Sequence, residues 1–249
     1  MSEERILITG GSSGLGRAIA GWFAERGASV VSVDLFAANE PAPNLVHIEC
    51  DLSSRQAVDR ALPAILAAGP YRWVFLNAGA SATGPFEALP PETIGKLIRL
   101  NAETPVLLAS TLMREQAISG GICIVSSLSH FTGYPGAATY AASKDAVAVY
   151  AKSVRKPFAR AGVSVTLACP GPLRTGHAAR HAPEGADASR RMLPQQAAEA
   201  IIAATQKGRK LAIPGSGPKL FALAGRIAPK LVTQQMRKLI LEKLDKPVW

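Results

Sequence analysis

Short apolar runs alternate with amphipathic segments along the first 170 residues of the chain. The apolar runs predict β-strands at Arg5–Thr9, Ser29–Asp34, Leu45–Cys50, Arg72–Leu76, Gly121–Ser126 and Val163–Cys169. Apolar residues at helical spacing predict α-helices at Leu15–Arg26, Arg55–Ala67, Glu92–Ile118 and Ala138–Ala161. Because continuous apolar strands alternate with helices, the pattern predicts an α/β fold with a parallel sheet covered on both faces.

The pattern changes after Pro170. A polar, small-residue segment is followed by a helix, a short strand and a tail of two amphipathic helices separated at Pro229, which we place at Gly176–Pro194, Gln195–Gln206, Lys210–Ile213 and Pro218–Asp245. No internal repeat or low-complexity linker is present, so we expect a single domain over residues 1–249, with a cofactor-binding and catalytic core at 5–175.

The segment Gly176–Pro194 is interpreted as a lid over the substrate, because so polar a segment packs poorly without a ligand. His177 and His181 stand four residues apart, but no Asp, Glu or Cys joins them at ligand spacing, and no metal site is expected. The three lid arginines leave open an anionic substrate as an alternative; they are Arg180, Arg190 and Arg191. His130 is interpreted as a pocket-wall residue and His47 as a surface residue.

The composition is that of a globular protein, with 48% hydrophobic and 18% charged residues among 249. No apolar run reaches the ~18 residues of a membrane span, and the mixed charges of Met1–Arg5 do not resemble a secretory signal. Cys50, Cys123 and Cys169 lie far apart on runs expected to be buried, which predicts a reduced, cytoplasmic protein.

A glycine-rich loop, Thr9-Gly10-Gly11-Ser12-Ser13-Gly14-Leu15-Gly16, joins the first predicted strand to the first predicted helix. Glycines there let the backbone approach a pyrophosphate, whose charge faces the free N–H groups of the helix. The glycine spacing is GxxxGxG rather than GxGxxG. We therefore expect Gly10, Ser12, Ser13, Gly14, Leu15 and Gly16 to bind a dinucleotide cofactor.

Asp34 ends the second predicted strand, twenty residues after Gly14. A carboxylate at this position accepts hydrogen bonds from ribose hydroxyls and repels a 2′-phosphate. Leu35 and Ser13 offer no positive charge to that phosphate, so the sequence favours NAD over NADP. The alternative is that Asp34 only caps a turn at the strand end.

Tyr140 and Lys144 occupy positions i and i+4 of a predicted helix and share one face. A tyrosine with an ordinary pKa near ~10 is a poor base, and a nearby ammonium favours its phenolate. Ser127 ends the preceding strand, at the sheet edge where ligands bind, and can hold a substrate oxygen beside Tyr140.

Together these residues resemble the short-chain dehydrogenase/reductase family, in its compact single-domain branch. The matching motifs are TGGSSGLG at 9–16, Asp34, Asp51-Leu52, NAG at 77–79, Asn101, Ser127, YAASK at 140–144 and PGPLRT at 170–175. The resemblance implies a Rossmann-like, doubly wound parallel sheet of about seven strands, followed here by a C-terminal amphipathic helical extension.

The resemblance also implies a role for each site residue. Tyr140 would be the general acid/base, Ser127 would anchor the substrate, and Asn101 would hold a water of the proton relay. Lys144 would bind the nicotinamide ribose and lower the pKa of Tyr140. Cofactor contacts would come from Asp51, Leu52, Asn77, Ala78, Gly79, Tyr140, Lys144, Pro170, Gly171 and Thr175.

A proline lies within the predicted helix that contains Asn101. Pro105 has no N–H to bond the Asn101 carbonyl, which would leave that carbonyl free to bind a water. The alternative is a kink that serves packing alone.

The C-terminal tail carries an apolar stripe at helical spacing, at Leu220, Leu223, Ala224, Ile227, Val232, Met236, Leu239 and Ile240, and has a net charge of +4 over residues 218–245 (six basic and two acidic residues). One interpretation is a helix pair that packs on its own subunit or on an oligomer partner, in a homodimer or homotetramer. The other is peripheral contact with an anionic membrane. Nucleic acid is not expected as a partner.

The sequence thus predicts an NAD-dependent oxidoreductase that interconverts a secondary alcohol and a ketone. Residues 210–215 read KLAIPG and lead into the long tail, which associates the chain with family members that act on lipophilic, steroid or acyl substrates. Two alternatives remain open: an NAD-binding regulatory or membrane-associated scaffold without turnover, and a nucleotide-sugar epimerase.

Overall fold

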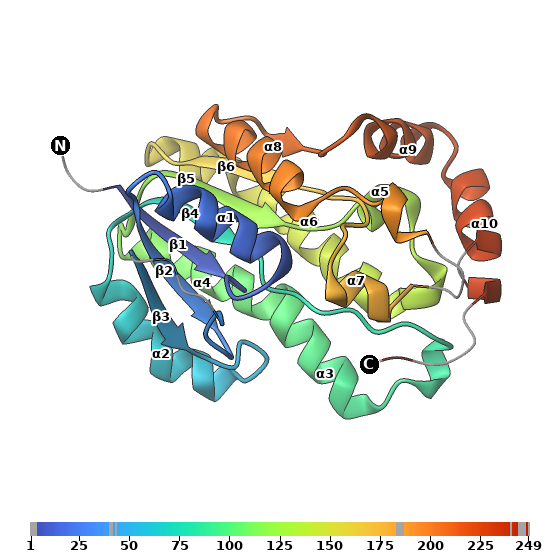
Figure 1. The fold of residues 1–249 in the computed structure, drawn as a ribbon, viewed down its shortest axis with the longest axis horizontal. Coiled ribbons are helices and arrows are strands. Elements are labelled where there is room, and N and C mark those ends of the chain that lie inside the picture. Colours follow the sequence, from blue (N-terminus) through green and yellow to red (C-terminus); the bar gives the residue numbers. More distant parts are fainter. Residues whose placement is uncertain are drawn as a thin grey trace.

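In the computed structural model, residues 4–39, 42, 44–182, 187–239, 241–243 and 248 are described. Seven strands form one parallel sheet in the order β3-β2-β1-β4-β5-β6-β7 (Figure 1). The strands are β1 (Arg5–Thr9), β2 (Ser29–Asp34), β3 (Leu45–Glu49), β4 (Tyr71–Leu76), β5 (Ile118–Val125), β6 (Ser164–Ala168) and β7 (Leu211–Ala212). The structure confirms the doubly wound, Rossmann-like sheet.

Helices cover both faces of the sheet and continue beyond it. The α-helices are α1 (Gly14–Ala24), α2 (Arg55–Ala67), α3 (Pro91–Ile98), α4 (Thr104–Arg114), α5 (Ser129–Thr132), α6 (Ala138–Arg160), α7 (Gly176–Arg180), α8 (Pro194–Gln206), α9 (Ser216–Ile227) and α10 (Pro229–Leu239). Short 3₁₀ turns lie at Phe86–Ala88, Pro135–Ala137, Ala188–Arg190 and Leu241–Lys243. Among the described residues, no helix has the length and hydrophobicity needed to cross a membrane.

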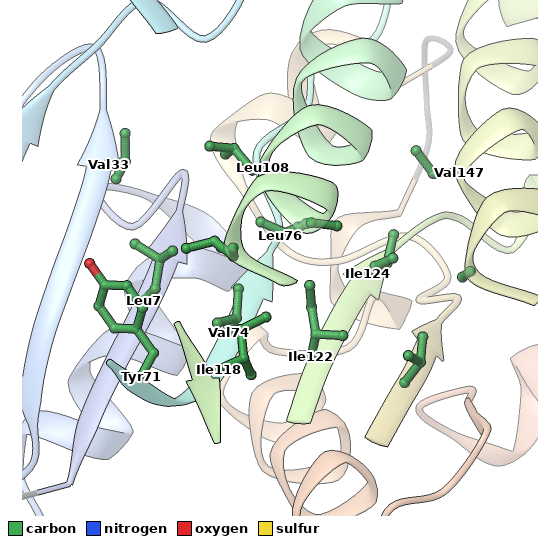
Figure 2. Packing of buried hydrophobic residues seen from close by; sticks show 14 of the residues in the cluster. Leu7, Val33, Tyr71, Val74, Leu76, Leu108, Ile118, Ile122, Ile124 and Val147 are labelled. Atoms are coloured by element: carbon green, nitrogen blue, oxygen red, sulfur yellow. The ribbon is translucent and has the colours of Figure 1, made fainter. Parts of the chain in front are cut away.

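Alternate residues of each strand point to opposite faces, and each face has its own apolar core. On one face, Leu7, Val74 and Ile122 pack among helices α2, α4 and α6 (Figure 2). On the other face, Ile6 and Ile8 pack with residues of α1 and α8. This two-sided burial explains why the strands are continuous apolar runs.

The predicted helix Glu92–Ile118 is not a single element. It divides into α3, one wider π-type turn at Arg99–Glu103, and α4, while β5 already begins at Ile118. Residues 91–114 nevertheless stay helical without a break, and Pro105 lies just after the π-type turn, which widens the helix where the proline has no N–H to donate.

The strand order places a crevice between β1 and β4. From β1 the chain builds outward through β2 and β3, and then crosses back to β4 and continues through β5 and β6. At such a switch point, the loops after the two strands separate and leave a ligand-binding crevice at their carboxyl ends. The loops after β1, β4 and β5 meet there.

Candidate active site

The glycine-rich loop after β1 is too tightly packed for larger residues. Gly10 and Gly14 have positive φ values of 72° and 53°. A Cβ added at Gly16 would lie only 1.8 Å from the Gly10 carbonyl oxygen. The loop backbone therefore packs closely against its neighbours and lines the cleft at the start of α1, where N–H groups favour an anion such as a pyrophosphate.

Asp34 holds this loop from the end of β2. Its carboxylate accepts hydrogen bonds from the backbone N–H groups of Ser12 (3.0 Å) and Leu35 (2.8 Å). The Ser12 hydroxyl also bonds the Phe36 carbonyl. Asp34 lines the same cleft as Gly14, so the carboxylate stands beside the glycine loop.

Asn77 and Ala78 hold the loop from β4. The Asn77 side chain donates to the carbonyl oxygens of Thr9 (3.1 Å) and Gly10 (3.3 Å). The backbone N–H groups of Asn77 and Ala78 in turn donate to the Thr9 hydroxyl, at 3.0 and 3.1 Å. These hydrogen bonds join the loops that follow β1 and β4 and fix the position of the glycine-rich loop.

Tyr140 and Lys144 lie on α6, on the turns that face the end of β5. The Lys144 ammonium donates to the Val125 carbonyl at 3.0 Å and is almost wholly buried, with 4% of the residue exposed. The Ser127 and Ser81 side chains both interact with the Tyr140 hydroxyl. Ser81 follows the NAG motif on the loop after β4, and its contact with Tyr140 was not predicted from the sequence.

Burial controls the titration of both groups. It raises the pKa of Tyr140, although the Ser127 and Ser81 hydroxyls act in the opposite direction. It lowers the pKa of Lys144 to about 8, because the ammonium loses its hydration. The expected lowering of the Tyr140 pKa by Lys144 is not seen in this structure, in which desolvation is the largest effect on both residues.

Asn101 lies on the π-type turn and is 1% exposed. Its amide accepts a hydrogen bond from the Ala80 N–H (3.0 Å) and donates to the Ala80 carbonyl (2.8 Å) and the Ser143 hydroxyl (3.0 Å). A Cβ added at Gly79 would lie 2.8 Å from the Lys144 Nζ and 3.0 Å from the Asn101 Oδ1. Gly79 therefore allows these two polar groups to converge.

The cleft that joins these groups is open and has a volume of about 1530 Å³. Of the residues predicted to bind the cofactor or to act in catalysis, sixteen line it: Gly10, Ser13, Gly14, Leu15, Asp34, Asp51, Leu52, Asn77, Ala78, Gly79, Ser127, Tyr140, Lys144, Pro170, Gly171 and Thr175. Ser12, Gly16 and Asn101 lie behind the lining, where Ser12 and Asn101 make the hydrogen bonds described above.

The predicted lid segment includes α7, a 3₁₀ turn and the start of α8, and its residues 183–186 lie outside the described part of the chain. Thr175 caps α7 by accepting the Ala178 N–H at 3.1 Å, and its methyl group faces Gly14. Burial, His181 and Arg180 lower the pKa of His177 to about 4. His177 of α7 therefore lines the cleft as a neutral imidazole at neutral pH.

Two other histidine predictions need correction. His130 is not in the pocket wall: its ring bonds the Asp145 carboxylate (2.7 Å) and the Lys152 ammonium (2.8 Å), both on α6. His47 is half-buried on β3 rather than on the surface. Within the described part of the chain, no group of three potential metal ligands occurs.

Comparison with known proteins identifies the class. The family model for short chain dehydrogenase matches residues 4–185. The 3-oxoacyl-[acyl-carrier-protein] reductase MabA of Mycobacterium tuberculosis is 32% identical over 177 residues, which cover 70% of each chain. The chain therefore belongs to the short-chain dehydrogenase family, as the sequence motifs predicted, and is an oxidoreductase of that family.

Solved structures agree on the fold. A short chain dehydrogenase from Burkholderia cenocepacia, in complex with NADP, has a TM-score of 0.81 at 22% identity and covers 94% of this chain and 97% of its own. A 3-ketoacyl-(acyl-carrier-protein) reductase from Brucella melitensis, in complex with NADH, has a TM-score of 0.72 at 25% identity, with 84% and 94% covered. The first of these structures contains NADP and the second contains NADH.

Proposed function

We propose that this protein is an NAD-dependent oxidoreductase that interconverts a secondary alcohol and a ketone, with Tyr140 as the general acid/base. The observation that carries the proposal is the position of the Tyr140 hydroxyl. It meets Ser127 and Ser81 in the same cleft that contains the glycine-rich loop. A proton-handling group thus lies where a bound nicotinamide and a substrate carbon can meet.

The residues present fit a dinucleotide. The loop backbone around Gly10 and Gly14, where added side chains would clash or be strained, would take the pyrophosphate at the start of α1. Asp34 would bind the adenosine ribose, and Asp51 and Leu52 would lie along the adenine. The further contacts would come from Ser12, Ser13, Leu15, Gly16, Asn77, Ala78, Gly79, Pro170, Gly171 and Thr175.

When bound, the nicotinamide supplies the hydride acceptor for oxidation and the donor for reduction. In oxidation, Ser127 holds the substrate hydroxyl and Tyr140 takes its proton as the carbon loses a hydride. In reduction, Tyr140 returns the proton to the carbonyl oxygen. Lys144 would hold the nicotinamide ribose, and Asn101, which bonds Ser143 and Ala80, would support the proton relay.

The preference for NAD rests on Asp34. Its carboxylate accepts the Ser12 and Leu35 N–H groups beside the loop and would face a 2′-phosphate with like charge. Neither neighbour, Ser13 nor Leu35, adds a positive charge. This arrangement favours the two free ribose hydroxyls of NAD.

The substrate proposed is uncharged or lipophilic, of the steroid, acyl or long-chain kind. Apolar and aromatic side chains that line the cleft support this proposal, among them Leu128, Tyr134, Met192, Phe221 and Met236. The lid arginines Arg180, Arg190 and Arg191 line the same cleft, so an anionic substrate is the alternative that the panel also tests. We place the enzyme in the cytoplasm as a homodimer or homotetramer. Burial raises the pKa of Cys50 to about 11 and of Cys123 and Cys169 to about 12, consistent with unreactive thiols in a reduced compartment.

The test follows nicotinamide absorbance with NAD or NADP and a panel of secondary alcohols, steroids and 3-hydroxyacyl thioesters. Wild-type protein should turn over with NAD, and Tyr140→Phe should lose about 10²–10⁴-fold in rate while still binding cofactor. Tyr150→Phe is the matched control, since Tyr150 lies on the same helix α6 outside the cleft lining, with its hydroxyl bonded to Ser110 at 2.9 Å. Cofactor binding without turnover in both proteins would favour the scaffold instead.

A further inference from the structure

The two C-terminal helices expose large apolar side chains and bury small ones. Ala222 and Gly225 face the body of the protein, whereas Leu220, Leu223, Ile227 and Leu231 are each more than half exposed. The large residues of the predicted stripe on α9 therefore do not pack on their own subunit, whereas Val232 and Met236 on α10 are half-buried and Met236 lines the cleft. Figure 1 shows α9 and α10 at the end of the molecule opposite β2 and β3.

Close packing fixes this orientation of α9. A Cβ added at Gly225 would lie 2.0 Å from the Phe131 carbonyl oxygen, so only glycine allows α9 to approach α5 this closely. Arg226 adds a cation–π contact between the same two helices, with its guanidinium 4.7 Å from the centre of the Phe131 ring. Leu220, Leu223 and Ile227 follow i, i+3, i+7 spacing on the opposite side and must face outward.

The charge around the exposed stripe has one sign. Between Ser216 and Leu239 the sequence contains five basic residues and no acidic residue; the basic residues are Lys219, Arg226, Lys230, Arg237 and Lys238. In an isologous dimer through this face, each basic surface would meet its own copy. Repulsion between like charges disfavours that dimer, whereas an anionic surface would neutralise the charge.

We propose that the outer face of α9 and the start of α10 docks on an anionic lipid bilayer, with Leu220, Leu223, Ile227 and Leu231 inserted among the acyl chains. A helix pair with large apolar residues on one side and lysine and arginine along its edges is suited to the bilayer interface. Phe221 lies on the flank of α9 and also lines the active-site cleft. The cleft therefore opens beside the docked face.

The docking is independent of the proposed hydride transfer and is measured without turnover. Wild-type full-length protein should cosediment with vesicles that contain phosphatidylglycerol, remain free with pure phosphatidylcholine, and be released by salt. Leu223→Ser with Ile227→Ser should weaken binding by about ten-fold for each residue. Lys219→Glu with Lys230→Glu should weaken it by at least about five-fold for each.

Matched controls lie elsewhere on the surface. Phe86, like Ile227, is 75% exposed. Lys207 is an exposed lysine that directly follows α8, outside the C-terminal helices. Phe86→Ser and Lys207→Glu should bind vesicles as wild type does. Absent binding by wild-type protein, or equal losses in controls and tail variants, would overturn the proposal. The proposal would also be overturned if the Leu223→Ser/Ile227→Ser variant bound vesicles as wild type does but had a different oligomer mass by light scattering. The face would then contact a second copy of the chain.

Discussion

The Nδ1 atom of His181 lies 3.2 Å from the Thr83 hydroxyl, in a buried hydrogen bond that joins the lid segment to the loop after β4. The backbone of the same Thr83 pairs with Val248, with both N–H···O distances 2.9 Å. Three distant segments thus meet at Thr83, two residues after Ser81, which contacts Tyr140. The segment predicted to be a lid and the loop after β4 are therefore joined by a hydrogen bond.

Thr83→Val keeps the side-chain shape but leaves the His181 ring nitrogen without this partner. We expect a loss of about 1–3 kcal/mol in the free energy of unfolding, measured by urea denaturation, and a raised KM for substrate. Thr233→Val serves as control, because Thr233 is exposed and donates a 3.3 Å hydrogen bond to the Thr132 carbonyl. Equal destabilisation by both variants would contradict the connection.

Lys144→Met should abolish turnover and yet stabilise the fold at neutral pH. Because burial lowers the Lys144 pKa from 10.5 to about 8, the folded state carries the cost of the ammonium below pH 8 and is relieved of it as the pH rises toward 10.5. We expect a gain of about 1–2 kcal/mol at pH 7, after the loss of the Val125 hydrogen bond.

The measurement is the free energy of unfolding of wild type and Lys144→Met across pH 7 to about 10.5. The difference between the two should shrink as the pH rises. A variant less stable than wild type throughout this range would show that the ammonium stabilises the fold.

Gly16→Ala should prevent cofactor binding, because the new Cβ would lie 1.8 Å from the Gly10 carbonyl oxygen and displace the loop. Gly21, on the same helix, has no atom within 4 Å of an added Cβ. Gly21→Ala should therefore bind cofactor normally and gain about 0.5–1 kcal/mol in stability from helix propensity. Cofactor titration and thermal unfolding distinguish the two, and normal binding by Gly16→Ala would be inconsistent with this loop geometry.

Asp34→Asn tests the cofactor preference by removing the negative charge, and it keeps one of the two oxygens that accept the Ser12 and Leu35 N–H groups. The KM for NADP should fall by about ten-fold, equal to ~1.4 kcal/mol, with a weaker effect on the KM for NAD. Asp59→Asn, at an exposed ion pair with Arg55, should change neither constant. Wild-type protein that uses NADP as well as NAD would refute the preference.

Asn101→Ala should lower kcat more than KM. Without the amide, Ala80 and the Ser143 hydroxyl lose their fixed positions beside Tyr140 and Lys144, and a small misplacement costs about 100-fold in rate. Steady-state kinetics provide the kcat and KM, and cofactor titration should give near wild-type affinity. Ser110→Ala is the control, since Ser110 is exposed and its hydroxyl bonds Tyr150 outside the cleft. A change confined to KM would place Asn101 in substrate binding instead.

Local sequence patterns predicted much of the fold. The bounds of β1, β2 and α2 agree with those expected from the apolar runs and the helical spacing, because such patterns depend on neighbours within a few residues. The glycine-rich loop and the Tyr140–Lys144 pair could be predicted because each also lies within a few residues of sequence. The predicted helix Glu92–Ile118 was wrong at its end and in its regularity, because the helix ends at Arg114 and contains a π-type turn at Arg99–Glu103 that apolar spacing does not reveal.

Contacts between distant segments were decided by the tertiary structure alone. No spacing in the sequence relates Ser81 to Tyr140, Thr83 to His181, or Gly225 to the Phe131 carbonyl. The periodicity of the tail predicted an amphipathic helix, but an apolar stripe normally indicates the buried face. Here the close approach of α9 to α5 admits only small side chains, so the fold turns the large apolar residues outward.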